Sequence, residues 1–414
     1  MPRRGVLGSL SALAVAGGWT GGAAWAGSPA KAPRIAVIGA GIIGVSIAYH
    51  LAGRGAAVTV YDKGQPGMGC TQGAFAMLIA GHGDGPPSFN ALYGLAVRDW
   101  HRLDRELAGR LPLQWGGTVN WAAPGAKAER LAGDCRRLAS WGVAARALDE
   151  ADFAGLCPGV TPGPFGGGYF LPEQGAVDVM GAMAVLLDAC RQHGVRFVTG
   201  EIEALPVDAA GHAAVLTSQG PVSADLIVLA AGADTTRLAQ SCQVRVPIDL
   251  VSGTLAHTRP MRPGLLARVL NGPQGSIKQN PDGRFVTGLD YAPGADGKDT
   301  SAAYGRHLLA NAAAMVPELA QAELDFMTLC YVPIPAEGQQ PIIGFCRQPA
   351  NLYVATMMSG VTMAPLVGRL IAGEVVDRVR ADVLAPWRPG RFNPRWAFDA
   401  YGGAMAPWLA CRQA

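Results

Sequence analysis

The sequence has few charged residues and no motif typical of a metal centre. Charged side chains make up 16% of the 414 residues, against roughly 25% in an average protein. Lysine and arginine total 34 and aspartate and glutamate total 31, with no basic run, so nothing indicates a nucleic-acid partner. The eight cysteines form no CxxC pair and no cluster with histidine at ligand spacing. The sequence therefore predicts no metal site, and the cysteine spacings do not indicate any disulfide pairing.

Long apolar runs are also missing beyond the N-terminal region, so we expect no stable membrane span in the mature protein. The N-terminus has Arg3 and Arg4, then an apolar stretch without acidic residues, and an Ala-x-Ala pattern that ends at Ala26. This order is typical of a twin-arginine signal that is cleaved after Ala26. An uncleaved anchor or a poorly ordered tail is the alternative. We expect residues 1–26 to direct the protein to the periplasm or out of the cell.

The stretch RIAVIGAGIIGVSIAYHLAGRGAAVTVYDKG, residues 34–64, contains a phosphate-binding pattern. The apolar run 35–38 predicts a strand that is buried on both faces. Gly39, Gly41 and Gly44 follow as GxGxxG. In this pattern the first glycine permits a tight turn, the second lets the backbone approach a pyrophosphate, and the third lets the next helix pack close to the strand. The amides at the start of that helix favour the negative charge of the phosphates.

A second predicted strand, residues 58–61, ends at Asp62. An acidic residue at this place binds ribose hydroxyls in dinucleotide-binding proteins. The strand, glycines, helix, strand and acid together predict a bound dinucleotide, although the pattern fits NAD and FAD alike. A βαβ unit without a ligand is the remaining alternative.

The same alternation of buried strands and helices returns in two later parts of the chain. We expect helices at residues 178–193 and 361–376 beside buried strands. The intervening segments contain shorter strand-like pieces and predicted helices at 88–110 and 302–315. A nucleotide domain in separated pieces, with a second domain between them, favours a tightly held flavin over an exchangeable NAD.

Four segments resemble the flavin-dependent amine and amino-acid oxidoreductases of the D-amino-acid oxidase, glycine oxidase and sarcosine oxidase type. They are the stretch at 34–64, GAVDVMGAMAVLLDACRQHGVRF, ADLIVLAAGADTTRLA, and QPIIGF followed by NLYVATMMSGVTMAPLVGRLIAGE. The resemblance implies an α/β fold, with a Rossmann-like FAD-binding domain built on a parallel sheet and interleaved with an antiparallel-sheet substrate domain.

The resemblance also implies domain limits and FAD contacts. The FAD-binding domain would comprise residues 33–80, 177–238 and 331–380, the substrate-binding domain 81–176 and 239–330, and a C-terminal extension 381–414. The implied FAD contacts lie on the glycine loop, near strand ends and at the start of the last helix. They are Gly39, Gly41, Ile42, Gly44, Asp62, Lys63, Thr71, Ile202, Ala231, Gly232, Ser359, Gly360, Val361 and Thr362.

The implied reaction is oxidation of the C–N bond of a small amine or amino acid, by hydride transfer to flavin N5 and hydrolysis of the resulting imine. The electron acceptor would be oxygen or a quinone or carrier, and the sequence leaves oxidase and dehydrogenase open. Three alternatives remain: a flavoenzyme that oxidises a C–O bond of the 2-hydroxy-acid type, an NAD(P)-dependent dehydrogenase, and a non-catalytic binding protein on the same fold.

The sequence departs from the family pattern where many relatives carry a substrate-binding arginine. That arginine binds a carboxylate with two donors, but this chain has Val332 or Pro333 there, depending on one inserted residue. Either another arginine (Arg245, Arg259 or Arg284) holds the carboxylate, or the substrate lacks an α-carboxylate.

If the same inserted residue is allowed, Cys330 falls where monomeric sarcosine oxidases carry the cysteine that is bonded to the flavin. It is either a covalent link to FAD or a small buried core residue. The candidates for contact with the substrate are Tyr331, Lys278 and Met358. Lys278 lies in a predicted hairpin, where a surface position is favoured over one near the cavity. The lysine that assists oxygen in sarcosine oxidases has no match here, because Val286 occupies its place.

Overall fold

The computed structural model describes residues 32–392 apart from 84–85, 290–296, 337 and 339. The predicted signal and the end of the predicted C-terminal extension lie outside these residues. The described chain from Pro33 onward belongs to one compact unit. Within the described residues, no helix has the length and apolar character needed to cross a membrane.

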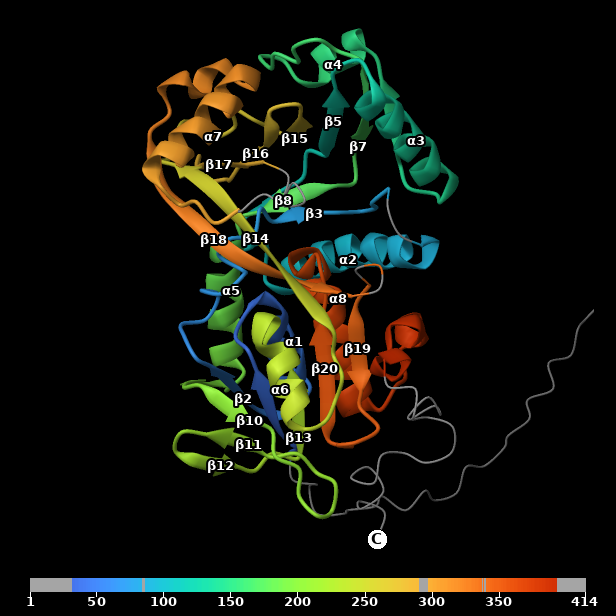
Figure 1. The fold of residues 1–414 in the computed structure, drawn as a ribbon, viewed down its shortest axis with the longest axis vertical. Coiled ribbons are helices and arrows are strands. Elements are labelled where there is room, and N and C mark those ends of the chain that lie inside the picture. The colour runs from blue at the N-terminus through green and yellow to red at the C-terminus, as the bar shows by residue number, and fades with distance from the viewer. Residues whose placement is uncertain (1–31, 84–85, 290–296, 337, 339, 393–414) are drawn as a thin grey trace, which may run out of the picture. The chain divides into compact units, whose positions relative to one another are not determined.

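A six-stranded sheet forms the base of one part of the fold (Figure 1). In spatial order its strands are β19 (Ile342–Phe345), β20 (Leu352–Thr356), β13 (Leu226–Leu229), β1 (Arg34–Ile38), β2 (Ala57–Asp62) and β9 (Arg196–Thr199). Five strands run parallel, and only β19 pairs in the antiparallel sense. The expected parallel sheet is confirmed.

The two faces of this sheet are covered by different elements, because alternate residues of a strand point to opposite faces. Ile35 and Val37 of β1 pack in one core cluster, while Ala36 and Ile38 pack in another. The first cluster is completed by α1 (Ile42–Ala52), α2 (Pro87–Glu106), α5 (Val179–Gln192) and α8 (Gly360–Ala372). The second is completed by α6 (Thr235–Ser241) and a small antiparallel sheet, β10 (Ile202–Ala204), β11 (Val215–Thr217) and β12 (Gly220–Val222).

An eight-stranded sheet forms the other part of the fold, drawn in the upper half of Figure 1. Its spatial order is β18 (Leu324–Pro335), β14 (Ile248–Thr258), β17 (Phe285–Gly288), β16 (Gly275–Gln279), β15 (Val269–Gly272), β5 (Thr118–Ala122), β7 (Gly167–Leu171) and β6 (Arg146–Leu148). All neighbours are antiparallel except β15 and β5. This parallel pair joins two distant segments of the chain, so no hairpin constrains its direction.

Smaller elements complete the described fold. A three-stranded sheet of β3 (Met77–Leu78), β8 (Gly175–Val177) and β4 (Leu113–Gln114) lies between the two large sheets in Figure 1. The remaining elements are α3 (Ala126–Ser140), α4 (Glu150–Leu156), α7 (Ala302–Met315) and the short helical turns η1 (Gly232–Asp234), η2 (Pro317–Gln321), η3 (Gly373–Asp377), η4 (Asp382–Trp387) and η5 (Pro389–Phe392).

The four long predicted helices are present, and local residues explain their ends. The Asp178 and Ser301 side chains accept bonds from backbone amides at the starts of α5 and α7, as capping residues do. The predicted helix at 88–110 ends earlier, at Glu106, because Ala108 and Gly109 adopt left-handed backbone conformations (φ 58° and 70°).

The predicted domain limits stay a prediction. Strands of the six-stranded sheet do come from all three segments assigned to FAD binding. However, β18 begins within 239–330 and ends within 331–380, so the limit at residue 330 falls inside one continuous strand.

The first residues of the predicted C-terminal extension pack onto this sheet through a buried carboxylate. Glu374 is 3% exposed. Its oxygens accept bonds from the Tyr353 hydroxyl (2.6 Å), the Ala381 amide (2.8 Å) and the Arg388 guanidinium. Because a buried charge is stable only when it is paired and hydrogen-bonded, this network fixes residues 381–388 against β20.

Replacing Arg388 by methionine should lower the free energy of unfolding by about 3–5 kcal/mol, because the Glu374 charge stays buried without its cation. The matched control is Arg34→Met, which breaks an exposed pair with Asp225 and should cost about 1 kcal/mol or less. Urea unfolding of the two variants measures the difference. Equal losses would show that the buried network does not hold this segment.

Candidate functional site

The glycine loop after β1 has a geometry that only glycine permits at two positions. Gly39 has a φ of 104°, and a Cβ there would lie 2.3 Å from the Ala230 carbonyl oxygen. At Gly44, a Cβ would lie 1.9 Å from the Gly39 carbonyl oxygen. The loop therefore packs directly against the end of β13, and α1 packs directly against the loop, as the sequence pattern predicts.

The first turn of α1 contains no acidic residue of its own. Gly41 is its N-cap residue, with no side-chain cap and no acidic residue in the first turn. The Thr71 hydroxyl accepts the Ile42 amide at 3.0 Å. Apart from the adjoining backbone, it is the one atom of the described residues within 4 Å of a Cβ built on Gly41, at 3.3 Å. The first turn of a helix has amides without intrahelical partners and a positive dipole end, which suits an anionic phosphate.

Asp62, at the end of β2, closes the glycine loop. Its carboxylate accepts the Ala40 amide at 2.7 Å and the Gly64 amide at 2.9 Å. The carboxylate predicted to bind ribose therefore lies beside the amides of the loop, at the same edge of the sheet.

The other predicted contacts around the nucleotide lie on two neighbouring elements. Lys63 pairs with Asp234 of η1 at 2.6 Å, which brings it to the turn that contains Gly232 (φ 55°) and follows Ala231. Ile202 belongs to β10 rather than to the large sheet. Its side chain is buried in the cluster that also contains Ile38 and Tyr61, and its carbonyl accepts a bond from Arg237 at 3.2 Å.

The start of α8 lies against the glycine-loop helix. A Cβ on Gly360 would lie 3.4 Å from the Ile43 side chain of α1. Ser359 has a left-handed backbone (φ 56°), and its hydroxyl contacts the Tyr93 hydroxyl at 3.0 Å. Burial raises the pKa of Tyr93 to about 12, so its phenol stays protonated at neutral pH. The predicted residues Ser359 and Gly360 are therefore brought to the same side of the molecule as the loop.

Thr362 ties this first turn of α8 to β3. Its hydroxyl donates to the Met77 carbonyl at 3.0 Å and accepts the Ile79 amide at 3.2 Å. The carbonyl of the preceding residue, Val361, accepts a bond from the Trp100 indole. No acidic residue lies in the first turn of α8, so its positive dipole end is also available to negative charge.

Trp100 of α2 holds the same turn, and the sequence interpretation did not identify it. Pro365 has no amide hydrogen, so the Val361 carbonyl has no helical donor. The Trp100 indole donates to this carbonyl at 3.1 Å and to the Thr362 carbonyl at 3.0 Å. The apolar spacing of α2 indicated only that Trp100 faces a core, since its partner lies more than 260 residues away in the sequence.

Cys330 of β18 is buried (2% exposed) against the segment that carries Thr71. Its thiol donates to the Gly73 carbonyl at 3.2 Å, and a Cβ on Gly73 would lie 2.6 Å from the Cys330 Cβ. A hydrogen bond with Cys330, together with burial, raises the pKa of the neighbouring Cys70 thiol. The seven described cysteines are free thiols. A covalent link from Cys330 to the flavin stays a prediction, which acid precipitation tests, because a covalent flavin stays with the pellet.

The other candidate residues occupy different environments. Tyr331 is 42% exposed on β18, and Met358 is half-buried beside Ser359. Lys278 is buried on β16, so the interpretation that placed it on the surface is wrong. The hairpin pattern did not indicate that Lys278 contacts the small sheet β3–β8–β4, where its ammonium group donates to the Val177 carbonyl of β8.

The three arginines considered as substitutes for the family's carboxylate-binding arginine all have interaction partners in the protein. Arg259 pairs with Glu323 and is 68% exposed. Arg284 bonds Asp325 and the Thr258 carbonyl. Arg245 is an exposed residue that has an interaction partner of its own. Val332 and Pro333 are half-buried on β18, where an apolar side chain provides no donor for a carboxylate.

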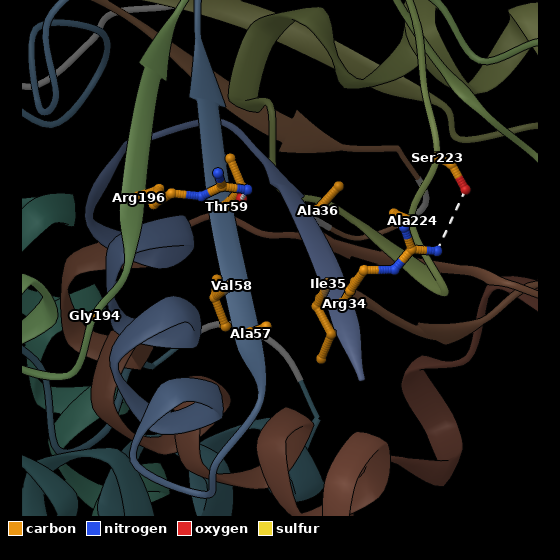
Figure 2. Close-up of a pocket in the computed structure, with 10 residues that line it drawn as sticks. All are labelled: Arg34, Ile35, Ala36, Ala57, Val58, Thr59, Gly194, Arg196, Ser223 and Ala224. Atoms are coloured by element: carbon orange, nitrogen blue, oxygen red, sulfur yellow. Dashed lines mark hydrogen bonds between the residues drawn. The ribbon is translucent and has the colours of Figure 1, made fainter. Parts of the chain in front are cut away.

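A surface hollow at the other end of the parallel strands is separate from this site. It has a volume of about 250 Å³ and is lined by the first residues of β1 and β2 together with Arg196, Ser223 and neighbouring residues. Figure 2 shows Arg34 directed toward Ser223 and Arg196 beside Thr59. The glycine loop follows the opposite ends of these strands. Within the described residues, no group of histidine, cysteine, aspartate and glutamate is arranged to hold a metal ion.

A family model described as FAD dependent oxidoreductase matches residues 34–374. The chain belongs to this FAD-dependent oxidoreductase family. It is 27% identical to the glycine oxidase of Geobacillus kaustophilus (strain HTA426) over 363 residues, which cover 85% of this chain and 95% of that protein. It is also 28% identical to 4-methylaminobutanoate oxidase (formaldehyde-forming) of Paenarthrobacter nicotinovorans. That match extends over 218 residues, 52% of this chain and 26% of that protein.

Solved structures give the same family relationship. The crystal structure of glycine oxidase from Geobacillus kaustophilus superposes with a TM-score of 0.78 and 26% identity, covering 87% of this chain and 99% of that one. Iminodiacetate oxidase from Chelativorans sp. BNC1 superposes with a TM-score of 0.73 and 26% identity, covering 86% and 99%. The mixed α/β fold and the assignment as an FAD-dependent enzyme are thereby confirmed.

The residues of this FAD-dependent oxidoreductase fit the cofactor. Gly41 leaves open space beside helix amides, and neither α1 nor α8 has an acidic residue in its first turn. The glycine loop, Asp62 and Thr71 would hold the nucleotide part of FAD, and the start of α8 would hold the ring. When bound, FAD accepts two electrons from an organic substrate. The protein's part is to bind, orient and shield the reactants.

A substitution at Gly41 should affect FAD affinity without affecting the stability of the fold. Gly41→Ala should change the free energy of unfolding of the cofactor-free protein by about 1 kcal/mol or less, since its Cβ meets only the Thr71 hydroxyl. FAD affinity should fall about tenfold or more, because the methyl group stands where the pyrophosphate approaches. Titration of FAD fluorescence measures the affinity, and urea unfolding measures the stability.

The control is Gly44→Ala, whose Cβ meets the Gly39 carbonyl oxygen at 1.9 Å. This variant should lose both stability and FAD. If Gly41→Ala binds FAD as tightly as the wild type, the phosphates do not lie over Gly41.

Proposed function

We propose that this protein oxidises the C–N bond of a small amine or amino acid. A hydride passes from the C–H beside the nitrogen to flavin N5, and the resulting imine is hydrolysed to a carbonyl compound and a free amine or ammonia. The observation that carries the proposal is the meeting of the glycine loop and the start of α8 in a chain that matches the FAD-dependent family over residues 34–374. Glycine, iminodiacetate and 4-methylaminobutanoate, for which three relatives are named, all contain an amine nitrogen.

The roles of the protein in this reaction follow from its electrostatics. The positive end of α8, held by Trp100, Tyr93 and Thr362, favours the negative charge that two-electron reduction brings into the site. A hydride transfer of this kind needs little acid or base assistance from side chains. This supports a site built mainly from backbone groups and apolar residues.

The side chains around β18 favour a substrate without an α-carboxylate. Val332 and Pro333 provide no donor, and Arg259 and Arg284 bond acidic residues. An unpaired carboxylate would be costly to bring into such a place. We infer that an N-methylated or primary amine without an α-carboxylate binds better than an α-amino acid. The relative named for 4-methylaminobutanoate supports this inference, since that molecule carries its carboxylate at the far end.

Anaerobic mixing with candidate substrates tests this function. 4-Methylaminobutanoate or a simple N-methylated amine should bleach the flavin absorbance at least about tenfold faster than sarcosine, which carries an α-carboxylate. Each turnover should release one equivalent of amine.

Three outcomes would contradict the proposal. Bleaching by glycolate without amine release would indicate oxidation of a C–O bond. A colourless protein that reduces NAD(P) would indicate the dehydrogenase alternative. No bleaching by any amine, amino acid or hydroxy acid would favour a non-catalytic binding protein.

We also infer that the protein acts in the periplasm or outside the cell. Arg3, Arg4 and the Ala-x-Ala pattern that ends at Ala26 support an export signal, and a twin-arginine route carries proteins that already hold their cofactor. Changing Arg3 and Arg4 together to lysine should keep the protein in the cytoplasm of a bacterium that has this pathway.

The matched control changes Arg136 and Arg137, an adjacent pair on α3, to lysine and should leave export unaffected. Cell fractionation and the mass of the mature protein, with Gly27 as its first residue, provide the readouts. Identical fractionation of both double variants would contradict a twin-arginine signal.

A further inference from the structure

Lys278 is a lysine buried in the sheet above the site. It lies on β16 and is 2% exposed. Its ammonium group donates to the Val177 carbonyl at 2.6 Å and lies 5.8 Å from the centroid of the Phe75 ring. Fully buried lysines are rare, and a buried ammonium normally has a carboxylate partner. A carbonyl and an aromatic face compensate only part of the charge.

The other charged and titratable groups near Lys278 do not fully balance the charge of its ammonium group. Asp178 and Asp282 attract the ammonium, but within the described chain neither forms an ion pair with it. On the sheet, Val286 of β17 pairs with Lys278 on one side and with His257 of β14 on the other. Burial lowers the pKa of His257 to about 4, so this histidine is neutral at neutral pH and adds no charge.

These surroundings make the charge of Lys278 easy to change. Burial, the dominant effect, lowers the pKa of Lys278 to about 7, although the two aspartates act in the opposite direction. A lysine with such a pKa is neutral in part of the molecules near neutral pH, unlike an exposed lysine. A new negative charge nearby would favour its protonated form.

A short hydrogen-bonded path connects Lys278 to the start of α8. The Val177 residue that accepts its bond donates its own amide to the Ala76 carbonyl at 3.1 Å. Ala76 has a left-handed backbone (φ 60°), and the next residue, Met77, accepts the bond from the Thr362 hydroxyl. Non-glycine residues in this conformation are strained and often mark functional sites. Lys278 is therefore linked through Val177 to Ala76 and Met77, the residues that bond to the first turn of α8.

We propose that Lys278 takes up a proton when the bound flavin is reduced and releases it when the flavin is oxidised. Reduction brings two electrons and one proton onto the flavin, so the site gains one negative charge. A proton from solvent then binds the Lys278 amine and restores the original charge. In a buried site of low dielectric, this compensation is much stronger than in water. Oxidation of the flavin reverses both steps, so charge and atoms balance over the cycle.

The pH dependence of the reduction potential tests the proposal, and it rests on bound FAD but not on the proposed substrate. For a two-electron couple, each proton taken up changes the potential by about 30 mV per pH unit. With Lys278 the slope between about pH 7.5 and 8.5 should approach about 59 mV per pH unit, for two protons. In Lys278→Met it should fall to about 30 mV per pH unit. Photoreduction without substrate, with a reference dye, gives the potential.

Proton uptake on photoreduction in weakly buffered solution at pH 8 gives a second readout. The wild type should take up two protons per flavin and Lys278→Met one. The matched control is Lys127→Met, at an exposed position on α3, which should behave as the wild type.

A wild type that takes up one proton overturns the proposal even if Lys278→Met fails to fold. Unchanged slopes in Lys278→Met also overturn it. Because no substrate enters the measurement, an incorrect assignment of the substrate leaves this result unaffected.

Discussion

The contact between α1 and α8 is the constraint on which the rest of the site depends. A Cβ on Gly368 would lie 2.5 Å from the Ser46 hydroxyl, which itself donates to the Ala364 carbonyl at 2.7 Å. The two helices can approach this closely only because a glycine faces a small polar side chain. Their N-termini then lie side by side, so two positive dipole ends converge in an arrangement that suits a negatively charged cofactor.

The helix α2 keeps this arrangement in place by contacts that local sequence does not reveal. The Asp99 carboxylate pairs with the Arg369 guanidinium at 2.7 Å. The Trp100 indole donates to the Val361 carbonyl, which has no helical donor because residue 365 is proline. The Tyr93 hydroxyl bonds with the Ser359 hydroxyl. Each partner on α8 is an otherwise costly feature: a half-buried charge, a carbonyl without a helical donor, or a residue with a left-handed backbone. The helix α2 therefore offsets the energetic cost of three local features of α8.

Local pattern was sufficient for the nucleotide half of the fold. Hydrophobic runs identified β1 and β2, and Gly39 and Gly44 have the close backbone contacts that their motif implies. Pattern failed where burial is decided by distant segments. The sequence suggested a surface position for Lys278 because a lysine in a hairpin usually has one, but Val177 of β8 and the Phe75 ring, both distant in the sequence, lie against it. The roles of Tyr93 and Trp100 were invisible for the same reason.

The order of strands in the parallel sheet has a consequence for how the enzyme is made. β1 lies at the centre beside β13, and β20 and α8 come from the last part of the described chain. A ribosome that has produced only the first 340 residues has therefore not yet supplied β20, which is the second neighbour of β13, or the N-terminus of α8. A cofactor site that includes both helix termini is therefore complete only after nearly the whole polypeptide is synthesised.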